Sequence, residues 1–140
     1  MTRLIYTTGY AGRDIFDLKP LVHALDALLV DIRFTPESDL MHWRRIYLKT
    51  LLGKKYRHVP HLGARSFRRS SSDAIQNLQL GVQTLLNLDS NIILMCVCAE
   101  YDDCHRRLIA TELEQQGINV VEIFDWKRPI PETAAEGFKL

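Results

Sequence analysis

The sequence of 140 residues contains no apolar run close to the roughly 20 residues that a membrane-spanning helix needs. Its first residues, MTRLIYTTGY, lack the long apolar region and the small-residue cleavage site of a signal peptide. We therefore expect a cytoplasmic location and no membrane contact. No linker, internal repeat or low-complexity block divides the chain, so we expect a single domain over residues 1–140, with a loosely attached tail from about residue 126.

Cysteine is also scarce. There are three, and an odd number in a chain without an export signal argues against a disulfide framework. The sequence has no C-x-x-C pair, no Walker loop and no G-x-G-x-x-G fingerprint, so we expect no cofactor and we rank metal binding below thiol chemistry. Small, buried, inert side chains are the alternative role for these thiols.

Acidic residues are absent from residues 40–72, although the net charge of the whole chain is only +1. This segment holds half of the 18 Lys and Arg residues, and all 17 Asp and Glu lie elsewhere. Local positive charge of this kind favours a phosphate-bearing partner, either a nucleotide or a nucleic acid, over a solvated basic face without a partner. The residues predicted to contact nucleic acid are Arg44, Arg45, Arg65, Arg68 and Arg69.

Short apolar runs alternate with segments of helical periodicity along the chain. The predicted strands cover residues 4–8, 28–33, 56–59, 92–97 and 119–124, and the predicted helices cover residues 14–28, 41–52, 72–88 and 104–116. Ser72 or Asp73 is the expected cap of the third helix. The alternation predicts a three-layer α/β domain of the Rossmann or flavodoxin kind, with a mostly parallel sheet of about five strands.

The stretch NIILMCVCAEYDDCHRR, residues 91–107, combines a buried strand with a polar loop and the start of a helix. All three cysteines, one histidine and two arginines fall in its last twelve positions. In open α/β sheets, ligands bind beyond the carboxyl ends of the strands, where loops lead into helices. We therefore expect the chemistry of the protein at this end of the strand. Asp31 and Arg33, on the same side of the second strand, are expected to project together, either as a mutual ion pair or toward a ligand.

Four patterns accompany these elements: TTGYAGR, VDIRFTPES, YRHVPHLG and CAEYDDCHRR. Together they resemble, over residues 4–123, the bacterial and archaeal family called domain of unknown function 488. The resemblance implies a compact α/β fold with a pocket built from these motifs, and it implies no particular activity. The family-like residues are Gly9, Tyr10, Arg13, Asp31, Arg33, Pro36, Ser38, His58, Pro60, Leu62, Gly63, Cys98, Glu100, Cys104, His105 and Arg106. Cys96 lies outside the pattern, and we interpret it as core packing.

The thiols suggest nucleophilic or redox chemistry at this pocket. A thiolate of Cys104 in the first turn of a helix would be stabilised by the helix dipole and by Arg106. The predicted catalytic residues are Cys98, Cys104, Asp31 and Glu100. The predicted substrate-binding residues are Gly9, Tyr10, Arg13, Arg33, Ser38, His58, His105 and Arg106.

The sequence therefore predicts a thiol-dependent transferase or hydrolase that acts on a nucleotide or a nucleic-acid-related phosphate substrate. A non-catalytic nucleic-acid-binding module that uses residues 40–72 is one alternative, and a thiol redox or metal-binding protein is another. The charge asymmetry is compatible with a homodimer that shares a basic groove. On the pocket hypothesis, Cys98→Ser or Arg106→Ala removes ligand binding and spares the fold. If these side chains are structural instead, unfolding is the main effect.

Overall fold

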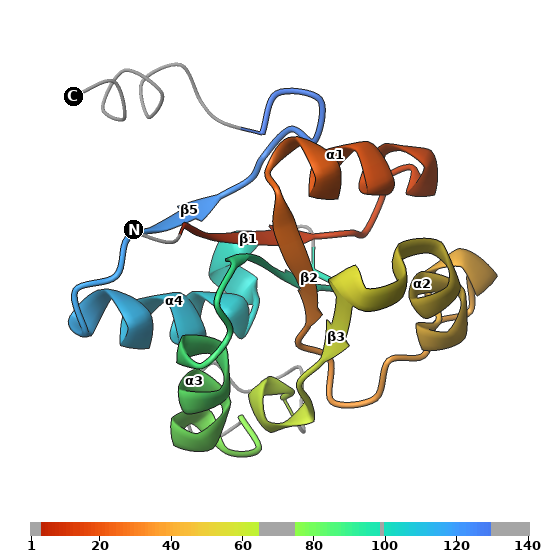
Figure 1. Cartoon of the computed structure of the whole chain (residues 1–140). Helices are drawn as coiled ribbons and strands as arrows, with labels where there is room; N and C mark the ends of the chain where they lie inside the picture. Colours follow the sequence, from red (N-terminus) through yellow and green to blue (C-terminus); the bar gives the residue numbers. More distant parts are fainter. Residues whose placement is uncertain (1–3, 65–74, 99, 130–140) are drawn as a thin grey trace.

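A computed structural model describes residues 4–64, 75–98 and 100–129. Five parallel strands form one sheet in the order β3-β2-β4-β1-β5 (Figure 1). The strands are β1 Ile5–Gly9, β2 Ala27–Asp31, β3 Tyr56–His58, β4 Asn91–Cys96 and β5 Val120–Glu122. The three central strands are almost entirely buried, as expected for a parallel sheet with both faces covered. The predicted α/β fold with a parallel, five-stranded sheet is confirmed.

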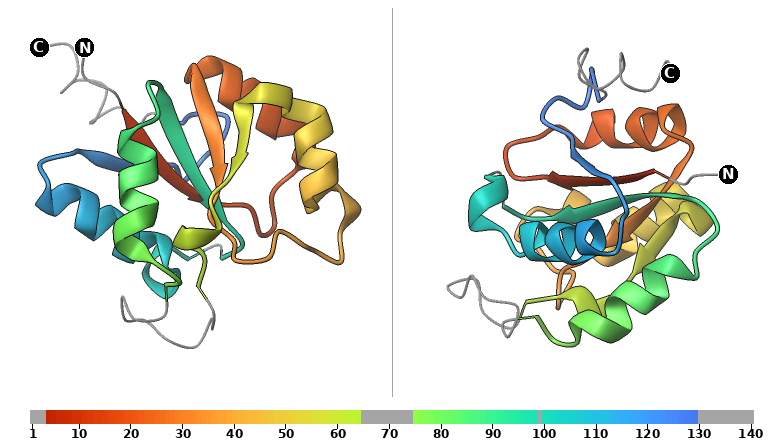
Figure 2. Two further views of the ribbon diagram at one scale, coloured as in Figure 1. Left: turned by 60° about the horizontal axis from the view of Figure 1, so that its bottom comes forward. Right: turned by 90° about the vertical axis from the view of Figure 1, so that its left-hand side faces the viewer.

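Helices cover both faces of this sheet (Figure 2). The helices are α1 Leu18–Ala24, α2 Arg45–Leu52, α3 Leu78–Leu86 and α4 Arg106–Gln115. Helices α1 and α2 pack on the face that carries Ile93 and Met95, whereas α3 and α4 pack on the face that carries Ile92 and Leu94. Successive side chains of a strand point to opposite faces, so the continuous apolar run of β4 supplies both core layers at once.

Two predicted helices begin later than their apolar periodicity indicates. The segment from residue 14 forms a 3₁₀ turn, Ile15–Asp17, before α1. Pro20 then lies in the first turn of α1, where its missing N–H group breaks no hydrogen bond. The segment from residue 41 forms a second 3₁₀ turn, Met41–Trp43, and the extended backbone of Arg44 separates it from α2.

The predicted start of the third helix is wrong. The side chain of Asn77 caps α3 by accepting a hydrogen bond from the Leu80 amide at 3.1 Å. Ile75 instead pairs with Ala64 in an antiparallel bridge, which is incompatible with a helix at that point. The expected caps, residues 72 and 73, lie outside the described part of the chain.

The tail was expected to be loose from about residue 126, but Trp126 is anchored in the core. Its side chain is only 5% exposed, and its Nε1 donates to the Thr8 hydroxyl at 2.8 Å. The indole ring also meets Trp43 edge to face, with 6.0 Å between ring centroids. The expectation is therefore wrong for Trp126, and residues 130–140 of the predicted tail are outside the described residues.

Within the described ranges, no helix has the length and apolar character that crossing a membrane requires.

Candidate functional site

Strands β1 and β4 are neighbours in the sheet, and the chain leaves them in opposite directions. From β1 it leads to α1 on one face, and from β4 it leads to α4 on the other face (Figure 2). This reversal creates the position where open α/β sheets bind ligands. The two departing loops are joined, because the amides of Tyr10 and Ala11 donate to the carbonyl groups of Cys96 and Val97, each at 3.0 Å.

Gly9 allows this close approach of the two loops. A Cβ atom on residue 9 would overlap the backbone carbonyl of Cys98 and would lie 3.0 Å from a guanidinium nitrogen of Arg106. The glycine therefore has a backbone role at the carboxyl edge. Its place among the predicted substrate contacts is explained by this packing without any ligand.

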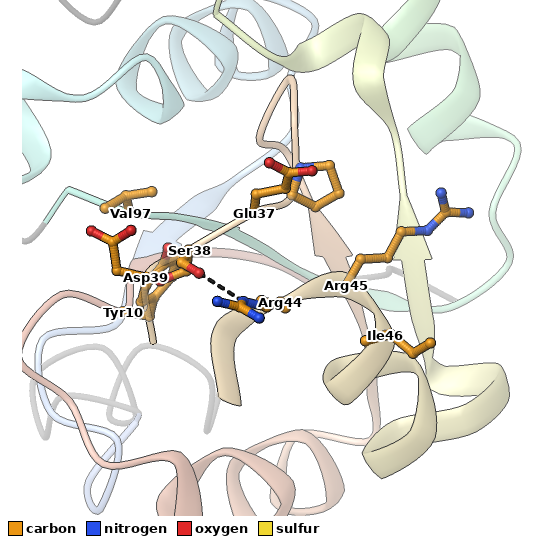
Figure 3. Close-up of a pocket in the computed structure, with 9 residues that line it drawn as sticks. Tyr10, Glu37, Ser38, Asp39, Arg44, Arg45, Ile46 and Val97 are labelled. Carbon is orange, nitrogen blue, oxygen red and sulfur yellow. Dashed lines mark hydrogen bonds between the residues drawn. The ribbon is translucent and has the colours of Figure 1, made fainter. Parts of the chain in front are cut away.

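A pocket of about 840 Å³ opens at this edge, on the face of the sheet that α1 and α2 cover (Figure 3). Tyr10 follows β1 and Val97 follows β4, while the loop after β2 and the start of α2 form the remaining wall. The residues that line it are Tyr10, Pro36, Glu37, Ser38, Asp39, Arg44, Arg45, Ile46 and Val97. Of the predicted substrate-binding residues, Tyr10 and Ser38 line this pocket.

Hydrogen bonds between the loop after β2 and the start of α2 hold the wall of the pocket together. Arg44 Nε donates to the Ser38 carbonyl at 2.9 Å, and the Arg45 amide donates to the Pro36 carbonyl at 3.0 Å. In Figure 3 the side chain of Arg44 points toward Ser38, whereas that of Arg45 points away from it. Both arginines are exposed, and so are the pocket carboxylates of Glu37 and Asp39. The pocket therefore presents charges of both signs to solvent.

Asp31 and Arg33 form a buried ion pair beside the pocket residue Tyr10. Arg33 donates to the two carboxylate oxygens at 2.8 and 2.6 Å, and the Tyr56 hydroxyl donates to one of them at 2.6 Å. Arg33 Nη1 also donates to the Tyr10 hydroxyl at 3.2 Å. Asp31 is fully buried and Arg33 is 3% exposed. The prediction that the two side chains project together is confirmed, and the structure pairs them with each other.

Charge and burial act together on the groups around Asp31. Burial by itself lowers the pKa of Arg33, but the hydrogen bonds and the negative charge of Asp31 outweigh it and raise that pKa above its ordinary value. Burial raises the pKa of Tyr56, and the neighbouring Asp31 charge raises it further. Arg33 is therefore charged and Tyr56 is neutral in the folded protein.

Tyr56→Phe is expected to lower the free energy of unfolding at about pH 8 by roughly 1.5–3 kcal/mol, because a hydrogen bond to a charged group is lost. Since the folded-state pKa of Tyr56 is raised, its contribution is complete below the ordinary tyrosine pKa of about 10 and is lost as the pH rises above it. Above that pH, the difference in free energy of unfolding between the wild type and Tyr56→Phe should therefore shrink by up to about 1.4 kcal/mol per pH unit. Urea unfolding at several pH values measures it, and a constant difference would contradict the assignment.

Arg106 makes a second buried ion pair, with Glu122 of β5. Its Nε and Nη2 donate to the two carboxylate oxygens at 3.0 and 2.7 Å. Its Nη1 donates to the Cys98 carbonyl at 2.7 Å and contacts the Cys96 sulfur at 3.1 Å. Arg106 is fully buried, and the Thr7 hydroxyl donates to the same carboxylate. The side chain thus connects α4 with the ends of β4 and β5.

The cysteines are divided between different environments. Cys96 and Cys104 are buried on the α3 and α4 face, where the structure pairs them as a disulfide with their Cα atoms 7.7 Å apart. Cys98 is partly exposed and carries a free thiol. Cys96, which we interpreted as core packing, is therefore buried as expected but also lies against a residue predicted to be catalytic.

His105 is buried beside this pair of sulfurs. Its Nε2 lies 2.9 Å from the Ile32 carbonyl, and its Nδ1 lies 3.8 Å from the Cys104 sulfur. Burial lowers the pKa of His105, and the nearby charge of Arg106 lowers it further, while the hydrogen bond to Ile32 opposes both. The imidazole is therefore neutral near pH 7 and adds no positive charge beside Cys104.

The remaining predicted residues lie in different places. Arg13 donates to the Gly9 and Phe124 carbonyls at 2.8 and 2.9 Å, and His58 Nε2 lies 2.8 Å from the Arg33 carbonyl. Glu100 is exposed. Three of the arginines predicted to contact nucleic acid, Arg65, Arg68 and Arg69, lie outside the described residues.

Three carboxylates at this edge of the sheet were not predicted from the sequence. Glu37 and Asp39 stand within or directly after the VDIRFTPES pattern, and their position after a strand could have indicated them. Glu122 lies far from Arg106 in the sequence. The feature that could have indicated Glu122 is its charge inside an otherwise apolar strand, because a buried charged residue requires a partner.

Comparison with known families finds one matching model, described as domain of unknown function DUF488, over residues 17–113. No curated protein and no solved structure matches the chain. The matched range contains the patterns VDIRFTPES, YRHVPHLG and CAEYDDCHRR, and TTGYAGR precedes it. The predicted family membership is confirmed: the chain belongs to the DUF488 family.

Proposed function

We propose that the pocket at the carboxyl edge binds a phosphate-bearing small molecule of the nucleotide class. The observation that carries this proposal is the position of a pocket of about 840 Å³ where β1 and β4 diverge, with two exposed arginines in its wall. That volume lies within the range of small-molecule sites, about 300–1,000 Å³. Guanidinium groups bind phosphate with paired, charge-assisted hydrogen bonds.

Arg44 and Arg45 suit this role better than Arg33 and Arg106, which the sequence favoured. Arg33 and Arg106 are buried, and each directs two nitrogens to a carboxylate within the fold. An anion could approach them only by displacing these partners. Arg44 and Arg45 keep their charge at the surface of the pocket, where a phosphate group can reach it.

Glu37 and Asp39 give the same pocket groups that can transfer protons. Both carboxylates are exposed at the pocket and neither belongs to the two buried ion pairs. A carboxylate within reach of a bound ligand can act as general acid or base in a hydrolase or transferase reaction. We therefore assign proton transfer, in an enzyme of this kind, to Glu37 or Asp39 in place of Asp31.

The test of this proposal uses the double variant Arg44→Ala/Arg45→Ala and calorimetric titration with ATP, GTP and inorganic phosphate. We expect binding to weaken at least about tenfold, since each charge-assisted hydrogen bond contributes roughly 1.5–3 kcal/mol. The matched control is Lys49→Ala/Lys54→Ala, which removes the same charge from exposed positions outside the pocket. The proposal is wrong if the wild-type protein binds none of these ligands, or if both double variants bind them as the wild type does.

A docking surface for nucleic acid is the second candidate, because exposed basic residues continue beyond the pocket. Lys49 on α2 and Lys54 and Arg57 after it are exposed, as are Arg44 and Arg45. Binding of a fluorescent single-stranded oligonucleotide would then weaken in both double variants and fall steeply with salt. Loss confined to Arg44→Ala/Arg45→Ala, with weak salt dependence, would favour the small-molecule pocket.

A further inference from the structure

The other face of the sheet carries a buried group of three side chains with atoms that bind transition metals. Cys96 ends β4, and Cys104 and His105 directly precede α4. One ligand atom from each of the three residues lies within 4.8 Å of the others. All three residues are buried, with exposed fractions of 1%, 3% and 8%. The pocket proposed to bind phosphate uses none of them.

We propose that Cys96, Cys104 and His105 bind one tetrahedral Zn²⁺ ion, with water at the fourth position. Thiolate and imidazole are the ligands that Zn²⁺ prefers in proteins, and a set of two cysteines and one histidine with an open fourth position is an established type of zinc coordination. The expectation from the sequence placed metal binding below thiol chemistry, because the chain has no C-x-x-C pair. In the folded chain a turn at Cys104 brings the side chains of both Cys104 and His105 to Cys96.

The hydrogen bonding of His105 supports this assignment. Its Nε2 lies 2.9 Å from the Ile32 carbonyl, which can only accept, so Nε2 carries the proton. Nδ1 then carries the lone pair and faces the Cys104 sulfur at 3.8 Å. Metal-binding histidines usually donate their second ring N–H to a carbonyl or carboxylate, and this contact fixes the ring orientation.

The separation of the two cysteines fits a shared ion. Their Cα atoms are 7.7 Å apart, beyond the range of about 4.4–6.8 Å that disulfides usually span. Two sulfurs bound to one Zn²⁺ at about 2.3 Å each, in tetrahedral geometry, lie about 3.8 Å apart. The structure pairs the two sulfurs as a disulfide, so binding of one ion requires that both thiols are reduced and that their side chains rotate apart.

The surrounding charges are balanced for such an ion. Two thiolates neutralise Zn²⁺, and the charge of Arg106 is neutralised by Glu122 at 2.7 Å. Arg106 Nη1, 3.1 Å from the Cys96 sulfur, can donate a hydrogen bond to the thiolate. Hydrogen bonds of this kind orient metal ligands, so Arg106 is a positioning residue for the site.

The test is a titration of the full-length, reduced protein with Co²⁺, which reports its coordination by visible absorption. We expect one Co²⁺ per chain, the intense bands of a tetrahedral ion, a near-ultraviolet thiolate charge-transfer band, and displacement by Zn²⁺. Cys96→Ser, Cys104→Ser and His105→Gln should each weaken binding by at least about tenfold. Cys98→Ser is the matched control and should retain one ion per chain, because Cys98 is not among the three clustered ligands.

Because the ligands are buried, folding of each variant is checked by circular dichroism. The titration of the wild-type protein tests the proposal even if a variant does not fold. The proposal is overturned if the reduced wild-type protein binds no Co²⁺ with thiolate bands. It is also overturned if Cys98→Ser abolishes binding while Cys96→Ser retains it. A Cys96–Cys104 disulfide found by mass spectrometry, in a protein that binds no ion once reduced, would assign the pair to redox chemistry instead. Arg44→Ala/Arg45→Ala should bind Co²⁺ as the wild type does, which separates this outcome from that of the phosphate pocket.

Discussion

Replacing Arg106 by methionine is expected to lower the free energy of unfolding by about 3–5 kcal/mol. Methionine keeps the apolar stem but removes the guanidinium, and Glu122 is then left in a nearly buried position without its partner. The carbonyl of Cys98 also loses its donor at 2.7 Å. The expectation from the sequence was the opposite, that Arg106 could be removed without harm to the fold, and full burial is the reason for the change.

Urea unfolding of the variant measures this effect. Arg107→Met is the matched control, because it removes the same charge from the next position of α4, where the side chain is only partly buried and joins neither buried ion pair. Its stability should stay close to that of the wild type. If Arg106→Met is as stable as Arg107→Met and only ligand binding is lost, Arg106 belongs to a binding site and our structural assignment is wrong.

The double variant Arg106→Met/Glu122→Gln separates the ion pair from the rest of the environment. If the pair accounts for the loss, the double variant should be more stable than the sum of the two single losses predicts, because no buried charge is left alone. Additive losses would show that packing around α4, and not the pairing with Glu122, dominates.

Asp31→Asn is expected to cause a loss of similar size, about 3–5 kcal/mol. The substitution preserves the shape of the side chain, but it leaves the guanidinium of Arg33 buried without a counter-charge and weakens the hydrogen bond from Tyr56. Chemical unfolding at neutral pH is again the measurement. A loss below about 1 kcal/mol would mean that Arg33 finds another partner, or that it turns toward solvent.

Two further variants make this result specific. Asp26→Asn removes a carboxylate that is 94% exposed and 3.9 Å from Lys55, so it should change stability little. Asparagine also tolerates the positive φ of residue 26. Adding Arg33→Met to Asp31→Asn should recover part of the lost stability, because the unpaired buried charge disappears. A further loss in that double variant would indicate that Arg33 stabilises the fold through Tyr10 more than through Asp31.

Local sequence patterns predicted the fold because the strands of a parallel sheet must be apolar on both faces. The run from Ile92 to Met95 has this character, and it forms β4 at the centre of the sheet. The limits of the helices were less predictable. Ile75 fits the apolar periodicity of a helix, but an antiparallel bridge to Ala64 holds it in an extended conformation. That contact depends on residues that are not neighbours in the sequence.

The sequence predicted a site at the carboxyl edge of the sheet, but it could not show which of the predicted side chains are buried and which are exposed there. Arg33 follows β2 and Arg44 directly precedes α2, yet Arg33 is 3% exposed and paired, whereas Arg44 is exposed at the pocket. Spacing says which side of a strand a residue occupies and does not say how deeply its neighbours bury it. Burial decides whether a charge is available to a ligand.

By itself, the sequence determined the fold class, the family and the edge of the sheet where the motifs meet, because these follow from periodicity and from local motifs. Only the tertiary structure decided which side chains contact one another. The pairing of Arg106 with Glu122 depends on β5 lying beside β1, and the meeting of Cys96 with His105 depends on the turn between β4 and α4. The physical reason is that electrostatic and ligand contacts act over a few ångströms in space, whereas a sequence records only separation along the chain.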